Sequence, residues 1–346
     1  MKRLFLFLLA LLFSLFSFAQ GNLILTMSDT VLTAEQVAAK NSNPTVLMYP
    51  LNMKDKIPQI QCGEDAEGFG PFSVSATRQV MFSKGNLQFN AGGGTHKCAD
   101  GTTQPGLWRF AEYQWDYVGN DADGTVYYNE QKSTHKQMSD SYDGWIDLYA
   151  WATSGWNSGA SMYQPWSTYQ WSPNYYPGND SEADLEDDFL FADWGVYNKI
   201  GNNAPFTWRT LSYEEWQYLY NSRERASELC GHATVNGVKG FVFLPDDWVT
   251  PDGITFVSGT NLQFTDNNFT MSEWEIMEKN NAVFLPAAGW RNGTNAFDLQ
   301  DSGCYWSSTH ASTERYAWYF GFANKKSGLD NTYKHNGHSI RVVHDL

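Results

Sequence analysis

Hydrophobic and polar positions alternate most clearly near the C-terminus. Tyr316, Trp318, Phe320 and Phe322 occupy every second position of one short segment. A period of two is typical of a β-strand with one apolar face, so we predict a strand over residues 316–323. A polar run follows from Asn324 to Asn336, and the chain then returns to an apolar stretch that ends at Val343. These features predict a strand, a polar surface loop and a closing strand, which together form a recognition surface.

Other parts of the chain predict a mixture of short strands and helices. Apolar runs indicate strands at 72–76, 80–89, 240–244 and 282–285. Capping boxes, in which a serine and a glutamate three positions later satisfy exposed backbone N–H groups, predict helices that begin at Ser212 and Ser272. We expect Gly231 to end the first helix. Few helices among many short strands place the fold in the α+β class.

The N-terminus has the layout of a secretory signal peptide. Lys2 and Arg3 precede an apolar stretch, Leu4–Phe16, and small or polar residues follow it up to Gln20. The apolar stretch is short for a membrane span. We therefore predict a signal peptide over residues 1–20 and an exported mature chain that is periplasmic, cell-surface or secreted, without membrane insertion.

The mature chain divides by composition into a leading segment and a main domain. Residues 21–70 predict an N-terminal extension that ends in a linker, because residues 62–70 are rich in glycine and acidic residues. The strand patterns begin at Phe72. We therefore place the main domain at residues 71–346.

The charge and the aromatic content narrow the classes of partner. A net charge of −15 argues against nucleic acids and anionic membrane surfaces as partners, because both require clustered positive charge. Aromatic residues make up 16% of the chain, with 15 tryptophans. Such rings supply either a large core or a recognition surface, and both interpretations remain open. For Trp208, Trp216, Trp290, Ile340 and Val342 we expect a place in the core.

The four cysteines allow two disulfides in an oxidising compartment. Adjacency along the chain favours the pairs Cys62–Cys98 and Cys230–Cys304, and free buried thiols are the alternative. No two of them have the close spacing of a zinc knuckle or a thioredoxin-like redox motif.

Several of these segments resemble known domains. Residues Thr207–Trp216 resemble the helix-leading motif of the formylglycine-generating-enzyme-like (sulfatase-modifying factor) domains. Tyr305–Thr309 and Gly337–Val343 are similar to segments of the Fibrobacter succinogenes major paralogous domain, which recurs in exported proteins of Bacteroidetes. The resemblance covers roughly residues 75–346. It implies a C-type-lectin-like fold with short antiparallel strands, about two helices and long irregular loops, and it transmits no activity.

The catalytic activity of formylglycine-generating enzymes requires residues that this chain lacks. Formylglycine-generating enzymes bind copper through two neighbouring cysteines near the C-terminus, whereas only Cys304 lies in that region here. The motifs of calcium-dependent lectins are missing too, since Leu244–Asp247 is not accompanied by Trp-Asn-Asp. We expect no enzymatic activity, no catalytic residues and no cofactor.

Three further groups could bind a metal, but each has an ordinary alternative. Gly119–Glu130 nearly matches a calcium loop through Asp121, Asp123 and Glu130, but its first position is glycine. The acidic run Glu182–Asp188 is typical of a solvated loop. His335 and His338 lack a cysteine or carboxylate partner at ligand spacing. We therefore predict no metal site.

The remaining interpretation is a binding module that recognises a glycan or a cell-surface protein. Aromatic rings stack on sugar faces, while amide, carboxylate and imidazole groups bind hydroxyls. The predicted ligand contacts are Trp306, His310, Tyr319, Asn324, Asn331, Tyr333, His335, Trp166 and Trp171. The alternative is a structural or adhesive surface protein with a protein partner, in which the C-terminal loop is diversified at its Asn, Tyr, Ser, Asp and His positions.

Overall fold

The structure is a computed structural model. It describes residues 66–117, 127–132, 135–138, 144–156, 175, 177, 180, 182–293 and 295–346. The chain divides after Lys56, and all described residues belong to the unit that follows. The signal peptide, the calcium-like residues Asp121 and Asp123, and the predicted contacts Trp166 and Trp171 lie outside the described residues.

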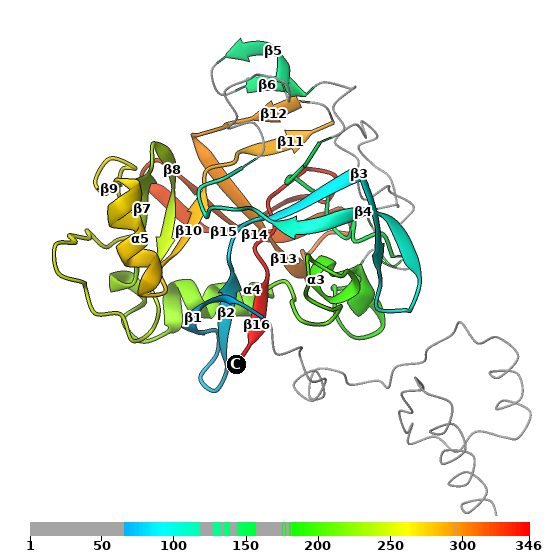
Figure 1. The fold of residues 1–346 in the computed structure, drawn as a ribbon, viewed down its shortest axis with the longest axis horizontal. Helices are drawn as coiled ribbons and strands as arrows, with labels where there is room; N and C mark the ends of the chain where they lie inside the picture. The colour runs from blue at the N-terminus through cyan, green and yellow to red at the C-terminus, as the bar shows by residue number, and fades with distance from the viewer. Residues whose placement is uncertain are drawn as a thin grey trace, which may run out of the picture. The chain divides into compact units, whose positions relative to one another are not determined.

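Short strands dominate the described part of the chain (Figure 1). They are β1 (Gly68–Ser73), β2 (Gln79–Ser83), β3 (Leu87–Lys97), β4 (Thr103–Phe110), β5 (Tyr127–Lys132), β6 (His135–Met138), β7 (Cys230–Val235), β8 (Val238–Phe243), β9 (Asn268–Phe269), β10 (Val283–Pro286), β11 (Trp290–Asn292), β12 (Asn295–Phe297), β13 (Ser302–His310), β14 (Tyr316–Ala323), β15 (Lys326–Tyr333) and β16 (Val343–Asp345). The strand predicted over 316–323 is therefore confirmed with the same bounds.

These strands form small sheets with mainly antiparallel pairing. Their orders are β1-β2-β16, β10-β8-β7-β9, β11-β12-β6-β5, β13-β14-β15 and β3-β4. The pairing of β7 with β9 is parallel. Because β1 already begins at Gly68, the end of the predicted linker belongs to a strand. The α+β class is confirmed.

Helices are few and short in the described residues. They are α3 (Trp194–Tyr197), α4 (Tyr213–Gln217) and α5 (Met271–Lys279), with 3-10 turns at Asp187–Ala192 and Ala226–Glu228 and a π-helical turn at Tyr218–Ser222. None of the helices in this part of the chain is long and apolar enough to span a bilayer.

The predicted capping box of α4 is confirmed, but the helix ends earlier than expected. The Ser212 hydroxyl accepts the Glu215 N–H at 3.3 Å, and the Glu215 carboxylate accepts the Ser212 N–H at 2.9 Å. The π-helical turn ends at Ser222, and Gly231 lies in β7 instead of closing the helix.

The capping box predicted for α5 at Ser272 is wrong by two residues. Thr270 is the N-cap, and its hydroxyl and N–H both bond the Glu273 carboxylate. Phe269, just before the cap, packs against Trp274 with ring centroids 6.3 Å apart. This hydrophobic staple favours Thr270 over Ser272, because it buries Trp274 on the inner side of the helix.

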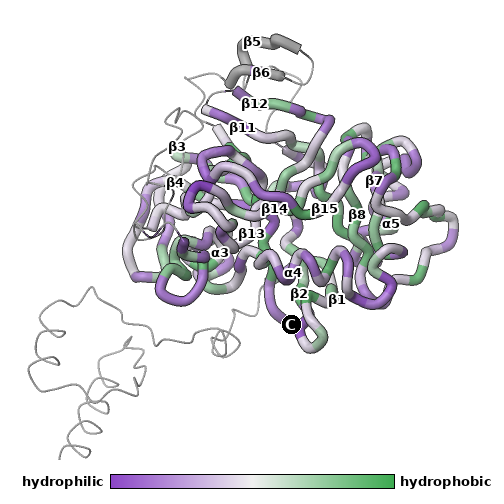
Figure 2. Tube along the Cα trace, turned by 180° about the vertical axis from the view of Figure 1, so that it is seen from behind, coloured by the Kyte–Doolittle hydropathy of each residue, from purple (hydrophilic) through white to green (hydrophobic). Residues whose placement is uncertain are grey.

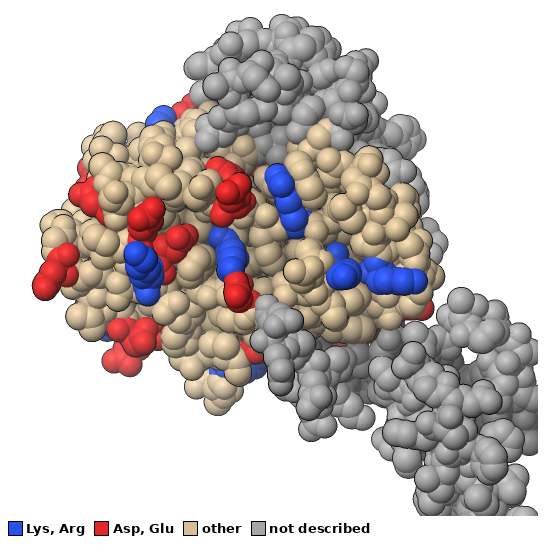
Figure 3. Space-filling view, in the orientation of Figure 1, with Lys and Arg blue, Asp and Glu red and all other residues tan. Residues whose placement is uncertain are grey.

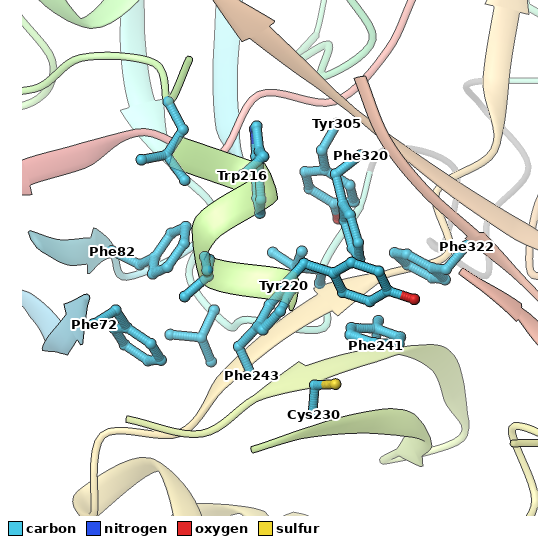
Figure 4. Close-up of a cluster of buried hydrophobic side chains, with 14 of the residues drawn as sticks. Phe72, Phe82, Trp216, Tyr220, Cys230, Phe241, Phe243, Tyr305, Phe320 and Phe322 are labelled. Atoms are coloured by element: carbon cyan, nitrogen blue, oxygen red, sulfur yellow. The ribbon is translucent and has the colours of Figure 1, made fainter. Parts of the chain in front are cut away.

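An aromatic cluster fills the space between α4 and the inner face of β13-β14-β15 (Figure 4). Trp216 stacks on Phe320 with centroids 5.2 Å apart and an interplanar angle of 13°. Phe320 also contacts Phe241 and Phe243 of β8 at 5.4 and 5.3 Å. The tube in Figure 2 is strongly hydrophobic along β8 and hydrophilic in the outer turns. Burial of such large rings is the main source of stability here.

Four of the five predicted core residues are buried. Trp208, Trp216, Ile340 and Val342 are at most 1% exposed. Trp290 is only half-buried, so its prediction as a core residue is wrong. It lies in β11, beside the pocket described below.

A half-buried ion-pair network connects α4 to the C-terminal strand β16. Arg209 donates to both carboxylate oxygens of Glu215, at 2.6 and 2.9 Å, and to both of Asp345, at 2.8 and 2.6 Å. The Arg209 guanidinium holds the pKa of Asp345 down, at about 2, against the opposing effect of burial. This bidentate geometry is the most favourable for arginine and carboxylate.

Candidate functional site: a pocket on the outer face of the C-terminal sheet

The polar run 324–336, predicted as a surface loop, is mostly a strand. Residues Lys326–Tyr333 form β15, which pairs with β14 in antiparallel register, Tyr319 opposite Asp330 and Gly321 opposite Gly328. Successive side chains of a strand point to opposite faces. The residues of 324–336 are therefore divided between an inner face, which carries Leu329, and an outer face, which carries Asp330.

A pocket of about 360 Å³ lies on this outer face. Its size falls within the range of small-molecule sites. It is lined by Trp290, Asp298, Ser302, Cys304, Tyr319, Gly321, Phe322, Ala323, Lys326, Ser327, Gly328, Leu329, Asp330, Thr332, Asn336 and His338.

Two glycines, Gly321 and Gly328, leave the space at the floor of the pocket free of side chains. Cys304, Gly321 and Gly328 lie opposite one another across β13, β14 and β15. A Cβ atom on Gly328 would meet nothing within 4 Å, and one on Gly321 would approach the Tyr319 ring to 2.6 Å. Gly328 also has a φ of +154°, which residues with a side chain rarely adopt. The hollow therefore exists because these two side chains are missing.

Aromatic rings form the walls of the pocket. Tyr319 packs edge-on against His338 at 4.8 Å, and His338 stacks on the buried Trp306 at 4.1 Å. On the other side, Trp290 stacks on Phe297 at 4.6 Å and donates its indole N–H to Asp298 at 2.9 Å. Both walls are thus held in place by packing from behind.

Two buried neutral polar atoms of the pocket lining have no partner in good hydrogen-bond geometry among the described residues, although the Ser302 hydroxyl lies near enough to the Cys304 thiol to lower its pKa. The two atoms are the Nδ1 atom of His338 and the hydroxyl of Ser302. His338 is 2% exposed, and burial lowers its pKa to about 3, so its imidazole is neutral at physiological pH. A buried polar atom without a partner costs about 1–3 kcal/mol.

The Cys304 thiol at the floor is protonated and therefore a poor nucleophile. Burial raises its pKa to about 12, and the charges of Asp298 and Asp330 act in the same direction. It is a free thiol, as are the buried Cys98 and Cys230. The expected disulfide Cys230–Cys304 is therefore not formed. Cys98 is also a free thiol, and its expected partner Cys62 lies outside the described residues.

The turn between β14 and β15 is fastened to the core at several points. Tyr220, in the π-helical turn after α4, donates to the Ser327 carbonyl at 3.0 Å, and the Ser327 hydroxyl donates to the Thr260 carbonyl at 2.6 Å. His232 Nε2 donates to the Lys326 carbonyl at 3.1 Å, and the Lys325 N–H donates to the Leu262 carbonyl at 2.9 Å. These contacts fix one rim of the pocket.

Among the predicted ligand contacts that fall on described residues, only Tyr319 lines the pocket. Asn331 and Tyr333 lie on the opposite face of β15, where Tyr333 packs on Tyr316 at 4.6 Å. Asn324 is exposed near the β14–β15 turn. His310 is half-buried at the end of β13, and its Nδ1 lies 2.7 Å from a carboxylate oxygen of Asp184.

Trp306 and His335 are in the interior, contrary to their predicted place on a recognition surface. Trp306 is 1% exposed and donates its indole N–H to the Tyr149 carbonyl at 2.7 Å. His335 is 9% exposed and stacks on Tyr333 at 5.2 Å. His335 belongs to the segment 334–343, which is buried throughout, and Trp306 is covered by His338 of the same segment.

Most of the pocket residues were not predicted from the sequence. Trp290, Asp298, Ser302, Gly321 and Gly328 carry no motif, and His338 was considered only as a metal ligand. One signal was available: period-two alternation continues from 326 to 333, with Ser327, Leu329 and Tyr333 on one side and Gly328 and Asp330 on the other.

Metal ligation finds no support in the described part of the chain, where no three His, Cys, Asp or Glu residues come together in a way that could hold an ion. In the acidic run, the Glu182 backbone N–H donates to the Asp180 carboxylate, and the Asp184 carboxylate makes a long-range contact by accepting the His310 backbone N–H.

Comparison with known proteins gives one partial match. Residues 259–343 match the profile of a domain of unknown function, DUF8237. This stretch contains every residue that lines the pocket. No curated protein and no solved structure matches the chain.

Proposed function

We propose that this chain is an exported, non-catalytic binding module that holds a saccharide in the pocket on the outer face of β13-β14-β15. One observation carries the proposal. The pocket combines aromatic walls, Tyr319 and Trp290, with two neutral polar atoms, on His338 and Ser302, that have no good hydrogen-bond partner among the described residues. Pyranose rings present apolar faces that stack on aromatic rings, and their hydroxyls both donate and accept hydrogen bonds.

The proposal includes a C-type-lectin-like fold related to the Fibrobacter succinogenes major paralogous domain. The short antiparallel strands and few helices are compatible with it. The signal-peptide pattern at residues 1–20 supports export to the periplasm, the cell surface or the medium. The net charge of −15 favours neutral partners over nucleic acid. In the view of Figure 3, lysine and arginine side chains are scattered and form no continuous basic stripe.

A glycan-array screen of the mature chain, from residue 21 onward, tests this function, with and without EDTA. We expect selective binding that survives EDTA. Tyr319→Ala should abolish it, because this removes one wall of the pocket. Tyr333→Ala is the matched control, since it removes a tyrosine from the opposite face of the same sheet and should leave binding intact. Loss of binding in EDTA would show instead that a metal takes part.

A second candidate is an adhesive protein that binds a protein partner. Four half-buried aromatic side chains favour it: Tyr213 packs on Trp318 at 4.5 Å, and Tyr316 packs on Tyr333 at 4.6 Å. They lie on the face of the sheet opposite the pocket, together with Asn331, and include residue types expected of a diversified surface. This function would be favoured if no glycan on the array bound and the chain bound a protein partner that Tyr333→Ala no longer bound.

A further inference from the structure

We infer that the pocket discriminates by charge: it accepts neutral or amine-bearing saccharides and rejects acidic ones such as uronic acids, sialic acids and sulfated sugars. This inference rests on the proposed saccharide binding and specifies its ligand class.

Two carboxylates from different elements flank the pocket. Asp330 lies on β15, directly opposite Tyr319, and accepts the Asn331 N–H at 2.8 Å. Asp298 follows β12 and accepts the Trp290 indole N–H at 2.9 Å. Each of them is therefore held beside an aromatic wall of the pocket.

The fields of both carboxylates reach the pocket floor. Asp298 and Asp330 each act on the Cys304 thiol, which lies at the floor, and each raises its pKa. A negatively charged ligand that occupies the hollow above Cys304 would feel the same two charges. An ammonium group in that place would be attracted by both.

The rest of the lining carries little positive charge of its own, and the buried Arg291, whose charge reaches His338, already donates to the Leu148 and Gly293 carbonyls. His338 is neutral, the Cys304 thiol is protonated, and the Asn336 amide already donates to the Thr332 hydroxyl at 3.0 Å. Lys326 is the single cationic residue of the lining. It is exposed next to the turn between β14 and β15. A long solvated side chain of this kind offsets less charge than a fixed one.

The size of the effect follows from the repulsion of like charges. Two unit charges about 4 Å apart repel by about 1 kcal/mol in water and by more at the lower effective dielectric of a pocket. With two carboxylates near the ligand, we expect an acidic sugar to bind about tenfold more weakly than its neutral counterpart.

Matched sugar triplets test the inference directly. Each triplet consists of a methyl hexoside, its 2-amino derivative and its uronic acid, in the gluco, galacto and manno series. Affinities are measured by calorimetry or by competition against an array hit. The wild-type chain should prefer the neutral or amino member about tenfold over the uronic acid, and roughly 0.5 M salt should shrink this preference by screening.

Two substitutions separate local from global charge. Asp330→Asn keeps the size of the side chain and its acceptor for the Asn331 N–H, and it should reduce the discrimination from about tenfold to about threefold. Asp252→Asn removes one charge from an exposed carboxylate that does not line the pocket, and it should leave the discrimination unchanged. Circular dichroism confirms that both variants fold.

The outcomes distinguish failure of this inference from failure of the proposed function. Equal affinities across a triplet would overturn charge discrimination while saccharide binding stands. If the chain preferred the uronic acid and Lys326→Ala abolished this preference, the proposed discrimination would be reversed, because Lys326 would then set the ligand class. No binding of any sugar would overturn the proposed function and this inference with it.

Discussion

The inner and outer faces of β13-β14-β15 are built from alternating residues of the same three strands, but they differ in packing and polarity. On the inner face, Tyr305, Phe320 and Phe322 join a dense aromatic cluster. On the outer face, the neighbouring positions Gly321 and Gly328 carry no side chain, and a pocket opens above them.

This difference shows how one short sheet can combine stability with a site. The inner rings contribute burial, which requires large side chains and tolerates no gap. The outer positions contribute less to stability. Glycine buries no side chain there, and the polar atoms of Ser302 and His338 have no good hydrogen-bond partner among the described residues. Substitutions on the two faces should consequently affect different measurements.

The largest expected effect belongs to the inner face. Phe320→Ala should reduce the free energy of unfolding by about 3–5 kcal/mol, because it leaves a cavity among Trp216, Phe241 and Phe243. Urea denaturation measures the change. Tyr319→Ala, one residue away on the outer face, is the control and should cost less than half as much. Equal losses would mean that the two faces do not differ in packing.

Acid should destabilise the protein through His338, which lines the pocket. Its folded-state pKa of about 3 lies below the unfolded value of roughly 6.5. As pH falls below about 6.5, the unfolded chain takes up this proton first, so stability declines and continues to decline until about pH 3. Between pH 7 and pH 5 we expect a loss of about 2 kcal/mol from this group.

His338→Phe isolates this contribution, since phenylalanine keeps the stack on Trp306 and does not titrate. The variant should show a flatter decline of melting temperature between pH 7 and pH 5. His232 and His335 also have pKa values lowered by burial, so some decline should remain. An unchanged slope would show that His338 does not carry the effect.

Filling the pocket floor should affect binding more than folding. In Gly321→Val, the new side chain displaces the Tyr319 ring and occupies the hollow. We expect saccharide affinity to fall tenfold or more, which corresponds to about 1.4 kcal/mol or more. The unfolding free energy should fall by about 1 kcal/mol, at the low end for overpacking, because the displaced ring is only half-buried. Retained affinity would place the ligand elsewhere.

The smallest effect is expected at Asn331, next to Asp330 but on the other face. Asn331→Ala should change the unfolding free energy by no more than about 0.5 kcal/mol and leave saccharide affinity unchanged. Calorimetric titration of a saccharide into Asn331→Ala and into Asp330→Asn compares the two variants. A clear loss of binding would show that the ligand reaches around the edge of the sheet.

The sequence predicted the inner face well and the outer face poorly, for a physical reason. Phe320, Phe322, Trp216 and the Ser212 capping box carry local signals, namely period-two aromatic spacing and short-range hydrogen bonds. The pocket instead joins Trp290 and Asp298 to β13-β14-β15 and His338, and its floor consists of missing side chains. Neither long-range proximity nor an absent side chain leaves a local pattern.

The error over residues 324–336 has a related cause. Asn, Lys, Gly and Asp are depleted in strands, so their abundance favoured a loop. Pairing with β14 and the fastening of the turn to Thr260, Leu262 and Tyr220 outweighed that intrinsic preference. Tertiary contacts of this kind cannot be read from the composition of the segment itself.

The fastened β14–β15 turn has a consequence for the kinetics of binding. Since the hydrogen bonds from Tyr220, Ser327 and His232 already hold the pocket rim in the free protein, a ligand has no segment to order on arrival. We expect a single-step association whose rate rises in proportion to ligand concentration without levelling off, and differences among sugars expressed mainly as differences in residence time.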